Sequence, residues 1–207
     1  MKTIKKDLES EIVGKKSKFI CNVFYIQNKE EARTKIEEIR KKYYDAKHHC
    51  FAYRVLENGK ILEKSSDDGE PSGTAGGPML LLLSKNELVN ILVIVTRYFG
   101  GILLGTGGLI RAYSGATSKA LDNSQVAELL EGQKLKIPIL YQQIPYLQYY
   151  CKKNDIVIAE TNFYKEPYAI IKISKDKKEK FIHEMKEKGF YVDKIELIED
   201  IYIQRTD

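Results

Sequence analysis

The chain has 207 residues, of which 43% are hydrophobic and 30% are charged, as in ordinary globular proteins. The formal net charge of +5 is spread over both halves of the chain, so charge alone does not predict a nucleic-acid partner. No apolar run reaches the roughly 20 residues of a membrane span, and the N-terminus lacks the apolar core of a signal peptide; we therefore expect a cytoplasmic protein without membrane association.

The first half of the chain alternates between strand and helix patterns. In chain order, the predicted elements are an extended segment over Ser10–Ile26, a helix over Lys29–Ala46, a hairpin that turns at Asn58-Gly59, a helix over Ala75–Leu83, a strand over Asn90–Tyr98 and a helix from Thr106 to Asn123. The strand over Asn90–Tyr98 is apolar on both faces, which predicts a central position in a sheet that is covered on both sides. Thr106 is the predicted N-cap of the last helix.

The sequence from Leu135 onward predicts a second domain. Its elements are a strand in LKIPILY, a helix in YLQYYCKKN, strands in IVIAETNFY and EPYAIIKIS, a helix in DKKEKFIHEMKEKG and a strand in KIELIEDIYI. This βαββαβ order is that of ferredoxin-like domains. A linker over Glu128–Lys134, with Glu131-Gly132 as the boundary, separates an N-terminal domain over 1–130 from a C-terminal domain over 134–207, and the fold class is α+β.

Ten of the fourteen glycines lie between Ser65 and Gly115, in the strings SSDDGEPSGTAGGP and RYFGGILLGTGGLIRAYSGA. Glycine loses more conformational freedom on folding than any other residue, so this density predicts close backbone approach or positive φ. Both glycine-rich loops lead into predicted helix N-termini, whose free N–H groups attract anions. The candidate ligand- or phosphate-binding residues are Ser72, Gly73, Thr74, Gly76, Arg97, Gly100, Gly101, Gly105, Thr106, Gly107 and Arg111.

The two arginines of this block have two interpretations. Arg97 ends the central strand and Arg111 lies about one turn into the following helix, so either guanidinium could hold a phosphate or carboxylate through two hydrogen bonds. Alternatively, Arg97 pairs with Asp67, Asp68 or Glu70 and fixes the loop to the sheet, because a buried arginine needs a partner. The block contains neither a Walker loop nor a dinucleotide-binding fingerprint.

Acidic and histidine side chains accompany the block as loop or supporting residues. Asp67, Asp68 and Glu70 carry the oxygens that a magnesium ion prefers, but Asp-Gly and Glu-Pro are turn dipeptides, and we favour a solvated turn. His48 and His49 open a strand and point to opposite faces, so a zinc site is not predicted. We predict no metal and no cofactor, with magnesium kept as the alternative.

Three widely spaced cysteines form no CxxC pair, and we expect them to be reduced thiols. Residues two apart on a strand share a face, which would bring Cys50 near His48 in the geometry that nucleophilic catalysis requires. We do not favour this interpretation, and no catalytic residue is assigned.

Three motifs, HHCFAY (His48–Tyr53), SDDGEPSGTAG (Ser66–Gly76) and RYFGGILLGTGGLIRAY (Arg97–Tyr113), resemble the YigZ/IMPACT family. The resemblance extends from Lys18 to about Leu121. It implies that the N-terminal domain has the fold of the second domain of the fifth small-subunit ribosomal protein. It also implies that the C-terminal domain is similar to the last domain of elongation factor G. Eukaryotic members regulate translation by competing for an activator of a stress-response kinase.

These observations lead to a hypothesis with two alternatives. The leading hypothesis is a non-enzymatic binding or regulatory protein that contacts RNA, the ribosome or a translation-associated protein through the glycine-rich face. The first alternative is an enzyme or sensor for a small phosphorylated ligand, a nucleotide with magnesium; the second is a protein-interaction adaptor. The chain has Gly77 and Leu103 where many family members carry a basic residue, which removes positive charge from the expected site.

Overall fold

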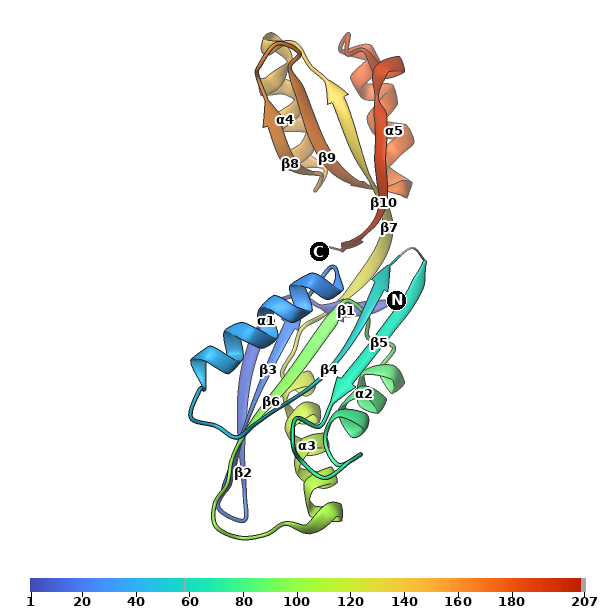
Figure 1. Cartoon of the computed structure of the whole chain (residues 1–207). Coiled ribbons are helices and arrows are strands. Elements are labelled where there is room, and N and C mark those ends of the chain that lie inside the picture. Colours follow the sequence, from blue (N-terminus) through green and yellow to red (C-terminus); the bar gives the residue numbers. More distant parts are fainter. Residues whose placement is uncertain (58, 206–207) are drawn as a thin grey trace. The chain divides into compact units, whose positions relative to one another are not determined.

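The computed structural model describes residues 1–57 and 59–205 and divides into two compact units, Met1–Ala127 and Glu128–Asp207. Each unit combines helices with antiparallel strand pairs (Figure 1). The division falls just before the predicted end of the N-terminal domain at residue 130. Within the described residues, no helix has both the length and the apolar character that a membrane crossing requires.

The first unit contains a sheet in the order β2-β3-β6-β4-β5, in which all neighbours are antiparallel. The strands are β1 (Lys2–Ile4), β2 (Leu8–Gly14), β3 (Ser17–Tyr25), β4 (His48–Glu57), β5 (Lys60–Ser66) and β6 (Ile91–Tyr98). The helices are α1 (Lys29–Lys42), α2 (Gly76–Lys85) and α3 (Gly105–Asp122). The predicted extended segment Ser10–Ile26 is two strands, because Lys15 and Lys16 turn the chain with positive φ. The predicted hairpin of β4 and β5 is present, although its Asn58 lies outside the described residues.

Strand β6 is central and buried on both faces, as its apolar sequence predicts. Val93 and Val95 pack in one core cluster with side chains of α2 and α3, whereas Leu92 and Ile94 pack in another with side chains of α1. Figure 1 shows α1 on one face of this sheet and α2 with α3 on the other. Since side chains alternate along a strand, Arg97 projects toward the face that α2 and α3 cover.

The second unit has the predicted βαββαβ order. Its elements are β7 (Val126–Pro138), α4 (Ile144–Lys153), β8 (Val157–Asn162), β9 (Tyr168–Ser174), α5 (Lys175–Glu187) and β10 (Glu196–Gln204), with short 3₁₀ turns η1 (Tyr141–Gln143) and η2 (Val192–Lys194). Strand β7 pairs with β9 and β10, and β9 pairs with β8, all antiparallel. Leu135 and Ile137 of β7 pack with Phe181 and Met185 of α5 in the core of this unit.

The predicted linker Glu128–Lys134 is instead part of β7. Gly132 pairs with both β9 and β10, and a Cβ on it would lie 2.4 Å from Cδ1 of Ile203 and 2.8 Å from the carbonyl oxygen of Ile173. The glycine therefore permits close packing inside a sheet, whereas in the sequence it has the character of a break between domains. Glycine is depleted in strands, so Gly132 predicts a break, but where glycine does occur in a strand it marks close approach of a neighbouring segment.

Two neighbouring glycines at the start of α2 differ in their surroundings. A Cβ on Gly76 would lie 2.7 Å from the backbone nitrogen of Ser66, whereas one on Gly77 would meet nothing within 4 Å. We predict that Gly76→Ala lowers the free energy of unfolding by about 1–3 kcal/mol through overpacking. Gly77→Ala leaves it unchanged or raises it by up to about 1 kcal/mol, because alanine has the higher helix propensity. Urea unfolding measures both variants, and equal effects would contradict the close approach.

Candidate binding site in the glycine-rich block

The structure divides the glycine-rich block into two segments with different surroundings. The first, Asp67–Thr74 between β5 and α2, is called the acidic loop. The second, Phe99–Leu104 between β6 and α3, is called the glycine loop. Most polar side chains of the acidic loop bond to the protein itself. The glycine loop carries no polar side chain, and Thr106 and Arg111 at the start of α3 are exposed.

Arg97 and Glu70 form a buried ion pair between β6 and the acidic loop. The distance from Nη1 of Arg97 to Oε1 of Glu70 is 2.7 Å, and the two side chains are 7% and 3% exposed. The hydroxyl of Tyr113 on α3 donates a second hydrogen bond to the same Oε1, at 2.8 Å. A loop, a strand and a helix thus meet at one carboxylate. Of the partners that the sequence left open for Arg97, Glu70 is the one found.

Arg97 also connects the acidic loop to the glycine loop. Its Nη2 lies 3.5 Å from Oγ of Ser17, which accepts a hydrogen bond of 3.2 Å from the Gly100 N–H. The guanidinium carbon lies 5.5 Å from the ring centroids of both Phe19 and Phe99, within the range of cation–π attraction. A Cβ on Gly100 would lie 2.0 Å from the Lys16 carbonyl carbon. The missing side chain of Gly100 therefore permits an approach within the protein.

Asp67 caps the N-terminus of α2. Its carboxylate accepts hydrogen bonds from the N–H groups of Gly73 (2.8 Å), Ala75 (2.9 Å) and Gly76 (2.8 Å). Partial burial disfavours its ionised form, but the three backbone donors outweigh burial and lower the pKa of Asp67. The expectation that this helix start binds an external anion is thus not supported, because an internal carboxylate already takes its donors. Ser72 is exposed, while the Thr74 hydroxyl donates to the Pro71 carbonyl at 2.6 Å.

Asp68 holds the other side of the acidic loop. Its Oδ1 lies 2.8 Å from Nη2 of Arg40, and its Oδ2 accepts a 2.7 Å hydrogen bond from the His49 N–H. Nδ1 of His48 lies 2.9 Å from the Asp68 carbonyl oxygen, and Nε2 of His49 donates to the Tyr43 carbonyl at 3.0 Å. Both histidines therefore support the loop and its neighbours.

The acidic loop is poorly suited to a magnesium ion. Each of its three carboxylates already accepts hydrogen bonds from groups of the protein. Across residues 1–57 and 59–205, no group of three or more His, Cys, Asp or Glu side chains is arranged to hold a metal. Carboxylates that hold backbone amides and guanidinium groups leave few lone pairs for a cation.

Cys50 lacks the properties of a nucleophile. Its side chain is buried, and the thiol lies 2.9 Å from the Asp67 carbonyl oxygen, to which it donates. Burial raises the pKa of Cys50 to about 12, so the thiol stays protonated at neutral pH. The hypothesis of nucleophilic catalysis with His48 is therefore not supported by this geometry.

The glycine loop exposes large apolar side chains. Leu103 is 83% exposed, Phe99 55% and Ile102 43%. Such a run on a solvent-facing loop is typical of an interaction surface. Gly101, inside the loop, and Gly105, just after it, have φ values of +81° and +68°, which favour glycine, and a Cβ on either would meet nothing within 4 Å.

Helix α3 follows this loop directly, and no side chain of the described residues caps the backbone N–H groups of its first turn. The helix begins at Gly105 with Leu104 at the N-cap, and within the described part of the chain no side chain bonds to its first turn. Thr106 is the second residue of the helix, which begins at Gly105 after the N-cap Leu104, so its predicted role as N-cap is incorrect. Among residues 1–57 and 59–205, a Cβ on Gly107 would have only Nη1 of Arg111 within 4 Å, at 3.9 Å.

Basic side chains surround the glycine loop. Arg111 is exposed and forms neither a hydrogen bond nor an ion pair among residues 1–57 and 59–205. Lys15 and Lys16 are exposed in the β2–β3 turn, which lies against the loop through Gly100 (Figure 1). No carboxylate occurs in the sequence between Leu88 and Leu121. This part of the first unit is therefore both apolar and positively charged.

Sequence reasoning missed several residues of this arrangement. Tyr113 lies within the helix predicted from Thr106 to Asn123, and a tyrosine hydroxyl that becomes buried needs a hydrogen-bond partner. The four apolar residues of the glycine loop, Phe99, Ile102, Leu103 and Leu104, were also a signal, since a loop needs no apolar run of its own. Arg40 and Ser17 gave no signal, because they lie 28 and 80 residues from the side chains that they contact.

The fold and the site define a two-domain α+β protein with a glycine-rich surface on its first unit. The sequence profile of the Impact N-terminal domain matches residues 15–121, which is more than half of the chain. The chain therefore belongs to the YigZ/IMPACT family, as its motifs predict.

Individual relatives extend this comparison. The IMPACT family member YvyE of Bacillus subtilis is 49% identical over 126 residues, which cover 61% of this chain and 58% of YvyE, less than two thirds of its length. An IMPACT family member of Haemophilus influenzae is 38% identical over 176 residues, covering 84% of this chain and 85% of that protein. The crystal structure of a hypothetical protein has a TM-score of 0.66 at 29% identity and covers 95% of both chains.

The buried pair predicts a large stability effect at Glu70. Glu70→Ala leaves Arg97 buried without a charge partner, so we expect the free energy of unfolding to fall by about 3–5 kcal/mol. The matched control is Glu11→Ala, which removes a surface pair with Lys18 whose side chains are 45% and 44% exposed. The control is expected to change stability by less than about 1 kcal/mol. Urea unfolding checks both, and similar losses would contradict the buried pair.

The cap formed by Asp67 predicts a difference in acid sensitivity. Since the folded-state pKa of Asp67 lies below its ordinary value of 3.8, its carboxylate stabilises the fold above pH 3.8 and loses this contribution as the pH falls further. Wild type should therefore lose more stability between pH 5 and pH 3 than Asp67→Asn does. Asp122→Asn, at the end of α3, is the control and should follow wild type. Parallel acid profiles for wild type and Asp67→Asn would contradict the cap.

Proposed function

We propose that this chain is a non-enzymatic regulatory protein of translation that contacts its partner through the glycine loop and the start of α3. Family membership supports this proposal, together with the translational role of the eukaryotic members. The partner we favour is the ribosome, and the cytoplasm is the corresponding place of action.

The observation that carries the proposal is the exposure of Leu103, Phe99 and Ile102 beside unpaired basic groups. Arg111 and the two lysines of the β2–β3 turn supply positive charge, and the uncapped start of α3 adds free N–H donors. A surface of this kind is complementary to a partner that offers both anionic groups and apolar contacts. Ribosomal RNA with its bound proteins offers both.

The surroundings of the buried residues favour binding over catalysis. The candidate nucleophile is protonated and buried, and the acidic residues hold amide and guanidinium groups. General acid–base chemistry needs a group with a pKa near the working pH and access to substrate. The carboxylates of the acidic loop are already engaged in hydrogen bonds and an ion pair within the described protein.

The proteins that the two units resemble also favour the ribosome as the partner. We infer that the second unit is a ferredoxin-like domain, because its βαββαβ order and the strand order β10-β7-β9-β8 match that arrangement. It resembles the last domain of elongation factor G, and the first unit resembles the second domain of the fifth small-subunit ribosomal protein. Both of those proteins act on or in the ribosome.

A small phosphorylated ligand is the second candidate. The free first turn of α3 favours it, because Gly101 and Gly105 leave room for an anion next to uncapped N–H groups. Such a ligand would bind without magnesium from the acidic loop, whose carboxylates are already bonded. Thermal stabilisation by nucleoside phosphates without a metal, together with no ribosome binding, would favour this candidate.

The proposal predicts that single changes in the glycine loop weaken ribosome binding. Leu103→Asp places a negative charge in the exposed apolar run, and we expect its affinity for bacterial ribosomes to fall at least about tenfold, as at an interface hot spot. Arg111→Ala should weaken binding less and reduce its dependence on salt, because it removes one cationic contact. Co-sedimentation with purified ribosomes over a range of salt concentrations measures both effects.

Matched controls lie on α2. Leu81 is 55% exposed and Lys85 is exposed, so Leu81→Asp and Lys85→Ala make the same chemical changes away from the glycine loop. Both should bind like wild type. Absence of ribosome binding at low salt, or equal losses in all four variants, would contradict the proposal.

A further inference from the structure

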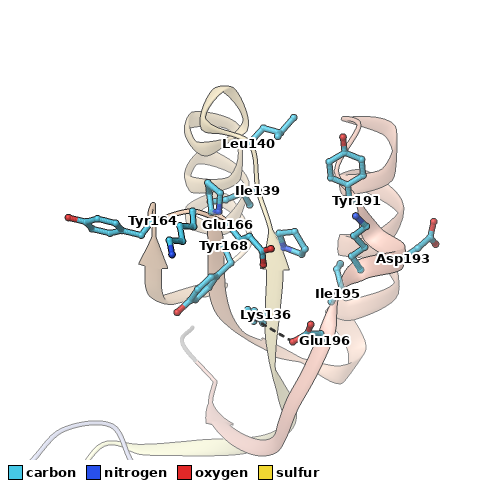
Figure 2. A pocket seen from close by; sticks show the side chains of 14 residues that line it. Lys136, Ile139, Leu140, Tyr164, Glu166, Tyr168, Tyr191, Asp193, Ile195 and Glu196 are labelled. Carbon is cyan, nitrogen blue, oxygen red and sulfur yellow. Dashed lines mark ion pairs between the residues drawn. The ribbon is translucent and has the colours of Figure 1, made fainter.

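The second unit contains a large cavity at the end of its sheet, independent of the glycine loop. Its volume is about 970 Å³, at the upper end of the roughly 300–1,000 Å³ of ligand pockets. Figure 2 shows its construction: the end of β7 forms the floor, the segment before and at the start of β9 forms one wall, and η2 with the start of β10 forms the other.

The walls of the cavity present tyrosine and proline side chains. Tyr168 and Pro167 lie on one wall, Tyr191 on the other, and Pro138 on the floor. The Tyr168 ring is held in place, because its hydroxyl donates to Oε1 of Glu160 at 2.9 Å and the ammonium group of Lys136 lies 4.8 Å from its centroid. A fixed aromatic ring offers a flat contact surface at little further cost in conformational entropy.

Tyr191 is the accessible aromatic residue of the opposite wall. It is 52% exposed, and the ammonium group of Lys194 lies 5.3 Å from its ring centroid. In the described part of the chain its hydroxyl has no hydrogen-bond partner. A free phenolic hydroxyl next to an apolar surface can donate to the carbonyl group of a bound peptide.

The charges around the cavity balance. Lys136, Lys165 and Lys194 are opposed by Glu166, Asp193 and Glu196, and Lys136 pairs with Glu196 at 3.8 Å. Sites for single-stranded nucleic acid combine aromatic rings with a positively charged groove. Here a polyanion would meet three carboxylates together with the three lysines. An uncharged ligand with apolar rings meets no such repulsion.

We propose that this cavity binds a proline-containing, extended segment of a partner protein. Proline-rich segments form a polyproline II helix without internal hydrogen bonds, and they dock in grooves lined by aromatic side chains. Their carbonyl groups remain free to accept from a hydroxyl such as that of Tyr191. Their rings pack against tyrosine faces. Because a polyproline II helix is already extended before binding, it loses little conformational entropy when it docks in an open cavity.

The test uses the isotope-labelled full chain and a decaproline peptide. Backbone amide shifts are followed by NMR during a titration to millimolar peptide. We expect shifts confined to the cavity, at Ile139, Leu140, 165–166, 168 and 191–196. Tyr191→Ala should raise the dissociation constant at least about fivefold, and Tyr191→Phe should raise it less, because the ring remains and the donor is lost.

Tyr149→Ala is the matched control. Tyr149 on α4 is 59% exposed, has the ammonium group of Lys153 5.8 Å from its ring, and does not line the cavity. Its variant should bind decaproline like wild type. The proposal is overturned by the absence of shifts at millimolar decaproline, or by equal weakening in the Tyr149 and Tyr191 variants. It is also overturned if a ten-nucleotide uridine RNA shifts the cavity residues while decaproline does not.

Discussion

The ion pair between Arg97 and Glu70 is the constraint on which the first unit depends. Arg97 lies on the face of β6 that α2 and α3 cover. It must have a partner there, because an unpaired charge in a protein interior strongly destabilises the fold. The acidic loop supplies that partner by folding across the end of the sheet, and Tyr113 of α3 bonds to the same oxygen. On its other side, the guanidinium group reaches Ser17, which holds Gly100. One charge thus sets the positions of two loops and a helix.

This arrangement separates the glycine-rich block into a scaffold and a surface. Gly76 and Gly100 approach other backbone segments inside the protein, and the carboxylates of the acidic loop serve as caps and ion-pair partners. Chemistry that faces solvent is left to the glycine loop and the start of α3. Leu103, Phe99 and Ile102 give this surface an apolar part beside its basic groups.

Much of the fold follows from local pattern, and the errors have physical causes. The two-faced apolar run of β6 and the βαββαβ order could be predicted, because periodicity and turn chemistry act over a few residues. The linker prediction failed at Gly132, since a glycine that permits close packing in a strand has the same sequence character as a break. The pairing of Arg97 could be anticipated but its partner could not. Asp67 illustrates the remaining limit, because whether a helix start binds an outside anion or an internal carboxylate depends on tertiary structure.

The division into scaffold and surface can be tested most directly by hydrogen exchange, measured by mass spectrometry with and without ribosomes. In the free protein, peptides that contain the bonded amides of Gly73, Ala75, Gly76 and Gly100 should exchange slowly, and those over 101–104 should exchange fast. On addition of ribosomes, protection should increase over 101–107 and remain unchanged over 67–77. Increased protection of the acidic loop with none in the glycine loop would contradict the division.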